Sequence, residues 1–157
     1  MKPIQNGIHE VFKNIKLSTY TAIVDDNFIN NLNDEFAPTC FQEEIIKTVE
    51  IRTFYLDKKT YSMAIFSQSD QTTSVDFRNY NYKKPNRTMP FNLPISINDK
   101  LILFMNKVGL NCGSFDLIYT PNKDFYFLEI NPVGQYGMVS HPCNYYLDKV
   151  IADYLIK

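Results

Sequence analysis

Two acids and an amide interrupt an apolar stretch in the last third of the sequence. The segment FDLIYTPNKDFYFLEINPVGQYG, residues 115–137, places Asp116, Glu129 and Asn131 among phenylalanine, leucine and isoleucine. Its two apolar runs flank a turn-forming stretch and predict a β-hairpin. A four-residue turn at 121–124 would place Asp116 directly opposite Glu129, a register that a slip of one residue would break.

The alternation of side chains along a regular strand sorts the second half of this hairpin into two faces. One face is predicted to carry Phe125, Phe127, Glu129 and Asn131. Like charges directly across a sheet repel, so something must offset the repulsion between the two carboxylates. Solvent at a wet sheet edge is one answer and a hard cation is the other, and the spacing alone leaves both open.

Two carboxylates and an amide oxygen form a donor set that suits Mg²⁺ or Mn²⁺ rather than zinc. Asn131 and Pro132 end the strand, and Gly134 and Gly137 follow in a loop. Acids at a strand end beside a loop are a usual place for chemistry. The loop therefore favours the cation.

The sequence has three arginines against thirteen lysines. Arg52 follows Glu50 by two residues, and Arg78 follows Asp76 by two, while Arg87 lies in a proline-bearing segment. Guanidinium groups bind phosphate and carboxylate in a bidentate manner that lysine cannot match. Two local acid–arginine pairs that steady the fold are the simpler interpretation, because such pairs are common and weak.

The elements that must position these residues follow from apolar periodicity and turn signals. Strands are predicted at 18–26 and 40–46, a helix capped by an aspartate at 27–36, a hairpin over 48–68 that turns at 57–59, and a long loop over 69–95. Helices are predicted at 96–110, with Ser96 as cap and Gly109 as stop, and at 143–157. The fold class is therefore α+β, with a largely antiparallel sheet and flanking helices.

Length and charge exclude several classes of protein. The chain has 157 residues, which suits one domain, and a formal net charge of −1, which gives no electrostatic case for nucleic acid or membrane. It contains neither an apolar run of membrane-spanning length nor a signal peptide, so a cytoplasmic location is predicted. Three widely spaced cysteines and two histidines argue against zinc and indicate reduced thiols.

Several motifs together resemble a known family. The segments MKPIQNG, CFQEEI, EIRTFYLDKKTYSMAIFSQ, DFRNYN, NRTMPFNLP and GSFDLIYTPNKDFYFLEINPVGQYG are similar, in that order, to ATP-grasp peptide maturases of the grasp-with-spasm type, relatives of the microviridin-type graspetide ligases. The resemblance covers essentially the whole chain, and FLEINPVGQYG with an upstream aspartate is its most specific part.

The resemblance implies a partial ATP-grasp domain. Residues 1–46 correspond to a remnant of the small nucleotide-binding lobe and hinge, and residues 47–157 to the C-terminal catalytic lobe. The resemblance also implies that the family's N-terminal domain is absent from this chain.

The resemblance also implies the nucleotide contacts. Lys2 matches a lysine on nucleotide phosphate, Gln42 and Glu43 match the hinge that faces adenine, and Glu50 matches the position that faces ribose. ATP is the expected cofactor.

The phosphoryl-transfer residues follow in the same way. Asp116, Glu129 and Asn131 match the ligands of Mg²⁺, with Mn²⁺ as the alternative metal. Arg78 resembles the residue that steadies the transferring phosphoryl group, and Arg52 lines the same phosphate site. Lys2, Arg52, Arg78 and Asp116 are expected to converge.

The implied reaction is ATP-driven ligation within a ribosomally made precursor peptide. A side-chain carboxylate becomes an acyl phosphate, and a lysine amine or a serine or threonine hydroxyl displaces phosphate to form an amide or ester. Gln135 and Tyr136 are candidates to touch that peptide, and a homodimer is considered. The alternatives are a truncated, inactive fragment that binds nucleotide or peptide, and a module that works with a separately encoded N-terminal half.

Overall fold

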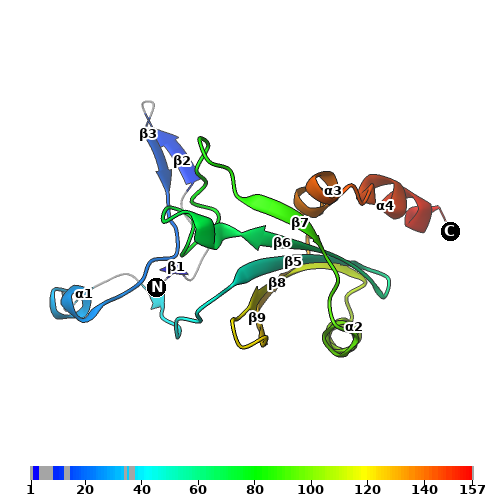
Figure 1. Cartoon of the computed structure of the whole chain (residues 1–157), viewed down its shortest axis with the longest axis horizontal. Coiled ribbons are helices and arrows are strands. Elements are labelled where there is room, and N and C mark those ends of the chain that lie inside the picture. The colour runs from blue at the N-terminus through cyan, green and yellow to red at the C-terminus, as the bar shows by residue number, and fades with distance from the viewer. Residues whose placement is uncertain (1, 4–8, 13–14, 34, 36–37, 157) are drawn as a thin grey trace. The chain divides into compact units, whose positions relative to one another are not determined.

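The computed structural model describes the chain except for residues 1, 4–8, 13–14, 34, 36–37 and 157 (Figure 1). The chain divides into two compact units. The first unit comprises residues 1–45 and 67–86, and the second comprises residues 46–66 and 87–157. The assignment of residues 1–46 and 47–157 to a nucleotide-binding and a catalytic lobe stays a prediction.

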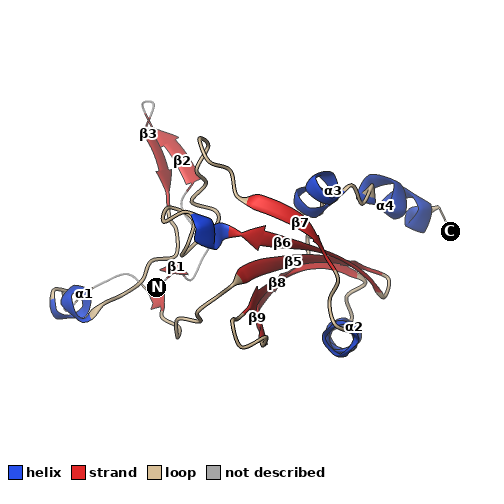
Figure 2. Cartoon of the chain, in the orientation of Figure 1, coloured by secondary structure: helices blue, strands red, loops and turns tan. Residues whose placement is uncertain are grey.

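The second unit is built on a five-stranded sheet in which every pair of neighbouring strands is antiparallel (Figure 2). In space the strands follow the order β7-β6-β5-β8-β9. Their bounds are β5 Val49–Leu56, β6 Lys59–Phe66, β7 Arg87–Phe91, β8 Cys112–Tyr119 and β9 Phe125–Asn131. The predicted α+β class with an antiparallel sheet is confirmed.

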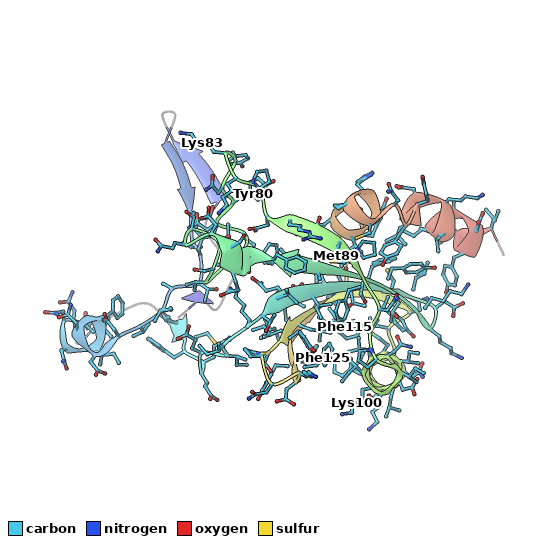
Figure 3. The ribbon with its side chains drawn as sticks, viewed as in Figure 1. Tyr80, Lys83, Met89, Lys100, Phe115 and Phe125 are labelled. Carbon is cyan, nitrogen blue, oxygen red and sulfur yellow. The ribbon has the colours of Figure 1, made fainter. Side chains whose placement is uncertain are left out.

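Helices cover both faces of this sheet (Figure 1). One face packs against α2 (Ile95–Val108), and the other carries α3 (Gly137–Cys143), from which α4 (Leu147–Leu155) continues. The hydrophobic core lies on the α2 side and consists of Val49, Ile51, Tyr55, Ala64, Leu101, Met105, Phe115 and Leu117. Figure 3 shows Phe115 and Phe125 on this side of the sheet.

Two predicted elements of the second unit have the expected local chemistry. The β5–β6 turn places Asp57 and Lys58 at φ 46° and 66°, and positive φ at both central residues is the geometry that matches the twist of a tight hairpin. Gly109, at φ 70°, ends α2 as predicted. The predicted cap at Ser96 is wrong, because α2 begins after Pro94 and has no side-chain cap.

Two other predictions in this unit are wrong. The predicted loop at 69–95 contains strand β7, in which Pro90 pairs with Met63 of β6. Proline lacks an N–H donor but is tolerated here because β7 is an edge strand. The single helix predicted at 143–157 is interrupted, because Asn144 and Tyr146 have positive φ and separate α3 from α4.

The first unit consists of short elements. Strand β1 (Lys2–Pro3) pairs with β4 (Thr39–Cys40), β2 (His9–Phe12) pairs with β3 (Ile15–Ser18), and a short helix α1 (Asp26–Asn30) and a 3-10 turn η1 (Ser67–Ser69) complete it. The strands predicted at 18–26 and 40–46 are therefore wrong beyond their first residue. The predicted aspartate cap is Asp25, which accepts a hydrogen bond from the N–H of Phe28 at 2.7 Å.

The two units differ in burial. No apolar residue of the first unit whose side chain the structure describes is buried, and its buried residues are Ser67, Thr73 and Asp76.

Among the described helices, none has the length and apolar character needed to cross a membrane.

Candidate metal and phosphate site

Three charged residues from three neighbouring strands form a row across the sheet face that carries α3. Arg52 of β5 pairs with Asp116 of β8, and Asp116 pairs in turn with Glu129 of β9. Directly paired residues point to the same face. Asn131 lies two positions beyond Glu129 and pairs with Ser114, so it belongs to the same face. The predicted pairing of Asp116 with Glu129 is confirmed.

A β-bulge produces this pairing. Tyr119 pairs with Phe125, so the turn spans five residues rather than the predicted four, and a regular ladder from there would place Asp116 opposite Leu128. The register shifts between Asp116 and Leu117, which leaves Leu128 as the extra residue of β9. Bulges of this kind re-aim side chains and are frequent beside active sites.

The bulge also corrects the predicted faces of β9. Phe127 packs against Phe104 and Phe115 on the α2 side, with ring centroids 5.5 Å and 6.1 Å away. Glu129 and Asn131 follow the extra residue and point to the opposite face. The prediction that one face carries Phe125, Phe127, Glu129 and Asn131 is therefore wrong. Glu129 and Asn131 lie on the face opposite the hydrophobic core.

Arg52 is the buried cation of the row, with 6% of its surface exposed. Its Nη1 donates to both carboxylate oxygens of Asp116 at 3.0 Å, and its Nη2 donates to Oε1 of Gln135 at 3.3 Å. The predicted local pair with Glu50 is not formed, because residues two apart on a strand are about 7 Å apart and Asp116 lies directly across. Glu50 instead accepts from Nζ of Lys47 at 2.7 Å.

The positive charge of Arg52 offsets part of the repulsion between the carboxylates of Asp116 and Glu129. The sequence alone indicated only solvent or a metal ion as the source of this compensation. A carboxylate has about four lone-pair sites, so a carboxylate that accepts hydrogen bonds from a guanidinium can bind a cation as well. Within the described part of the chain, no cluster of three or more His, Cys, Asp or Glu side chains is placed to hold a metal. The donor set of Asp116, Glu129 and the Asn131 amide fits Mg²⁺, which takes few protein ligands and completes its shell with water and phosphate.

The buried polar atoms on this face support the same interpretation. In the described residues, Arg52 Nε and Ser114 Oγ are the buried side-chain nitrogen and oxygen atoms without a hydrogen-bond partner. Ser114 lies two residues before Asp116 on β8, and Arg52 lies across from Asp116. Native structures rarely leave such atoms unpaired, so a polar ligand would find partners here.

The loop between β9 and α3, residues 132–136, folds over this face. Asn131 Oδ1 accepts from the N–H of Val133 at 3.0 Å, and the N–H of Gly134 donates to the Asn131 carbonyl at 3.1 Å. Gly134 has φ 58°, and a Cβ there would lie 3.2 Å from the Phe54 ring. This tight turn brings Gln135 to Arg52, a contact that the sequence did not predict.

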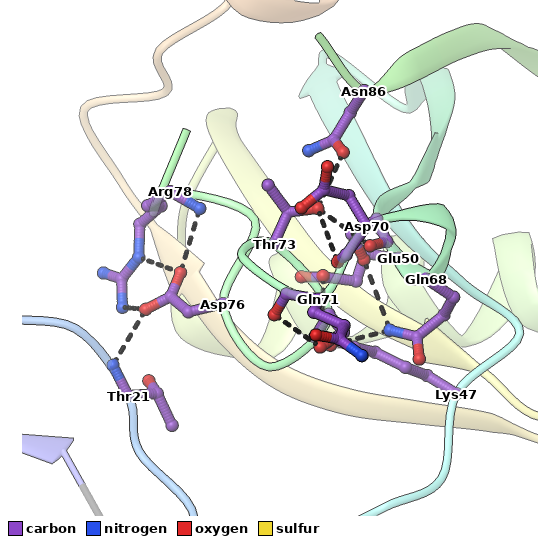
Figure 4. A network of polar contacts seen from close by, with 12 residues as sticks. Thr21, Lys47, Glu50, Gln68, Asp70, Gln71, Thr73, Asp76, Arg78 and Asn86 are labelled. Carbon is purple, nitrogen blue, oxygen red and sulfur yellow. Dashed lines mark hydrogen bonds and ion pairs between the residues drawn. The ribbon is translucent and has the colours of Figure 1, made fainter. Parts of the chain in front are cut away.

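Arg78 belongs to the first unit, where Asp76 holds it (Figure 4). The Asp76 carboxylate accepts from Nε and Nη2 of Arg78 at 2.8 Å and 2.6 Å, and from the N–H of Thr21 at 2.9 Å. Burial disfavours ionisation of Asp76, but these hydrogen bonds outweigh it and hold its pKa below the ordinary value. The predicted local pair is confirmed, and 55% of the Arg78 side chain is exposed.

The predicted nucleotide contacts remain predictions. The backbone of Lys2 pairs with Cys40, and its side chain lies outside the described part. Gln42 and Glu43 are exposed in the segment after β4. Of the four residues expected to converge, Arg52 and Asp116 meet in the second unit, and the others belong to the first.

Sequence comparisons find no match to a model of a known protein family and no similar curated protein. Solved structures do match. The macrocyclase MdnC of Microcystis aeruginosa MRC, bound with precursor peptide MdnA, aligns with 90% of this chain at 32% identity and a TM-score of 0.69. A RiPP-associated ATP-grasp ligase of Chryseobacterium gregarium, in complex with ADP and a leader and core peptide, aligns with 85% of it at 23% identity and a TM-score of 0.73.

The chain has part of the ATP-grasp fold. The ATP-grasp ligase PsnB, complexed with minimal precursor, Mg and ADP, aligns with 99% of this chain at 18% identity and a TM-score of 0.67. The chain covers 43% of MdnC, 40% of the Chryseobacterium ligase and 44% of PsnB. The resemblance predicted from the motifs is confirmed, and the chain spans less than half the length of these proteins.

Proposed function

We propose that this ATP-grasp chain supplies the metal-binding and phosphate-binding face of an ATP- and Mg²⁺-dependent carboxylate ligase that matures a ribosomally made precursor peptide. The observation that carries the proposal is the row of Arg52, Asp116 and Glu129, continued by Asn131 on the same sheet face. The solved relatives support it, since MdnC is bound with a precursor peptide and PsnB with Mg and ADP.

In this proposal the chain's residues bind and orient the reacting phosphates. Asp116, Glu129 and Asn131 hold the cation, which when bound neutralises charge on the nucleotide phosphates. Arg52, fixed by Asp116 and Gln135, keeps a positive charge beside that site. Such fixed charges need no reorganisation during the reaction, which makes positioning and electrostatics the main contribution of the protein.

The proposed reaction has two steps. A carboxylate oxygen of the precursor attacks the γ-phosphorus of ATP, the bond from that phosphorus to ADP breaks, and an acyl phosphate forms. An amine or hydroxyl of a second side chain then attacks the acyl carbon, loses a proton and expels phosphate, which leaves an amide or ester. Arg78 is proposed to steady the transferring phosphoryl group, because Asp76 holds its guanidinium while half of the side chain remains exposed.

The remaining site residues are proposed to bind the nucleotide. Lys2 is assigned to a phosphate, Gln42 and Glu43 to adenine, and Glu50 to ribose. Glu50 shares its carboxylate with Lys47, so nucleotide binding at this position involves the pair rather than the acid alone.

Calorimetric titration with Mg²⁺ and ATP tests the proposal. Glu129→Ala removes one carboxylate of the donor set, and we expect the binding heat of the unaltered chain to disappear. Asp124→Ala is the matched control, because Asp124 is an exposed acid in the turn of the same hairpin and should bind as the unaltered chain does. Equal heats for Glu129→Ala and the unaltered chain would end the metal assignment.

A binding module without chemistry is the second candidate, favoured by the lack of a buried apolar residue in the described part of the first unit. The two candidates differ in turnover. The ligase hydrolyses or transfers the γ-phosphate of ATP in the presence of a peptide carboxylate. An assay of released phosphate measures this turnover. The module binds nucleotide and releases no phosphate above the uncatalysed background.

A further inference from the structure

Ser114 is a fully buried serine, with 0% of its surface exposed, whose hydroxyl has no hydrogen-bond partner among the described residues. Leaving a buried hydroxyl unpaired costs free energy. Two other buried serines of this unit are paired: Ser62 Oγ lies 2.7 Å from Thr53 Oγ1, and Ser140 Oγ accepts from the N–H of Leu147 at 2.9 Å. The unpaired hydroxyl of Ser114 therefore needs a physical explanation.

The position of Ser114 in the sheet supplies a candidate partner. Ser114 pairs directly with Asn131, in the register that also pairs Asp116 with Glu129. Cβ atoms of directly paired residues lie about 5 Å apart, within reach of a hydrogen bond between a hydroxyl and an amide. Asn131 Oδ1 accepts from the N–H of Val133 at 3.0 Å, and no residue in the described part accepts from its Nδ2.

The strands approach closely beside this pair. Gly113 precedes Ser114, and a Cβ at Gly113 would lie 3.3 Å from the carbonyl oxygen of Asn131 and 3.2 Å from Cδ1 of Ile130. The absence of a side chain at this position lets β8 and β9 pack tightly. The backbone of Asn131 is therefore fixed, and the rotation of its side chain decides where the amide oxygen points.

We propose that Ser114 positions the amide of Asn131 for the cation. When Oδ1 of Asn131 turns from the Val133 amide to the metal, Nδ2 of the same planar amide donates to Oγ of Ser114. Fixing one end of a planar amide aims the other, as outer partners of metal ligands generally do. The inference rests on the proposed function, and Ser114 acts through Asn131 rather than on the substrate.

Ser114→Ala tests this inference with two readouts. In the free chain the substitution removes an unpaired buried hydroxyl, so the denaturant midpoint should rise. With ADP present, the affinity for Mn²⁺, measured from the electron paramagnetic resonance of the free ion, should fall about 10-fold. A serine that stabilises the free fold would lower the midpoint when it is replaced, and a serine with no role at the metal would leave the Mn²⁺ affinity unchanged.

Ser62→Ala is the matched control, because Ser62 is a buried serine on the other face of the same sheet. It loses its bond to Thr53, so its midpoint should fall while Mn²⁺ affinity stays unchanged. Suppose that Glu129→Ala weakens Mn²⁺ binding. In that case, unchanged Mn²⁺ affinity or a lower midpoint in Ser114→Ala overturns the Ser114 inference alone. Equal Mn²⁺ binding by the unaltered chain and Glu129→Ala overturns the proposed function and this inference together.

Discussion

The two units of the chain hold their candidate phosphate-site arginines in different ways. In the second unit Arg52 is 6% exposed and lies in a sheet with a packed hydrophobic core. In the first unit the Arg78 side chain is 55% exposed, and hydrogen bonds to Asp76 hold it in a unit without a buried apolar residue in its described part. Stability is not uniform across a structure, so the candidate metal site belongs to the more stable region and Arg78 to the more easily opened one.

The largest expected effect tests the core of the second unit. Phe115 is 0% exposed and packs against the rings of Tyr55, Phe104 and Phe127. Phe115→Ala should lower the free energy of unfolding by about 3–5 kcal/mol, because the cavity cannot close. Denaturant unfolding followed by tyrosine fluorescence measures this, since the chain has no tryptophan.

Phe28→Ala is the matched change in the first unit, where Phe28 is 38% exposed. Its effect should stay within about 0.5 kcal/mol, as for other surface substitutions. A loss equal to that of Phe115→Ala would show that Phe28 is part of a core and would remove the contrast between the units.

The next effect concerns the buried ion pair. Asp116→Ala leaves the Arg52 guanidinium buried, with the hydrogen bond to Gln135 at 3.3 Å as its remaining side-chain contact among the described residues. Removing one partner of a buried pair costs about 3 kcal/mol or more, because an uncompensated charge remains. Denaturant unfolding of the second unit measures the loss.

Asp76→Ala is the corresponding change beside Arg78. Water can solvate a guanidinium that is half exposed, so the loss in unfolding free energy should be clearly smaller than for Asp116→Ala. If the two losses are equal, the first unit holds its arginine as firmly as the second unit holds Arg52.

The parts of the fold that sequence predicted well depend on local signals. The β5–β6 turn at Asp57 and Lys58 and the end of α2 at Gly109 both follow from residue types at the turn itself. Long-range pairing is different. Arg52 meets Asp116 because β5 lies beside β8, and no spacing within β5 reveals a neighbour 64 residues away.

The pairing of Asp116 with Glu129 was predicted correctly for a reason that the structure corrects. The turn is one residue longer than assumed, and the bulge at Leu128 adds one residue back to β9. Leu128 is apolar like its neighbours, so the periodicity of β9 gives no sign of an extra residue. Because the extra residue was not predicted, the predicted faces of Phe125 and Phe127 were also wrong.

The smallest effect is the acid sensitivity of the first unit. Hydrogen bonds from Arg78 and Thr21 hold the pKa of Asp76 below its ordinary value of 3.8. A carboxyl with a depressed pKa in the folded state stabilises that state above its ordinary pKa and loses this contribution as the pH falls through the depressed value. Protection of the Thr21 amide from hydrogen exchange should therefore fall below about pH 4, while that of the central strand β5 stays constant. Asp76→Asn removes the titrating group and should make Thr21 protection independent of pH in this range; if the variant keeps the same acid loss, another carboxyl controls the opening of this unit.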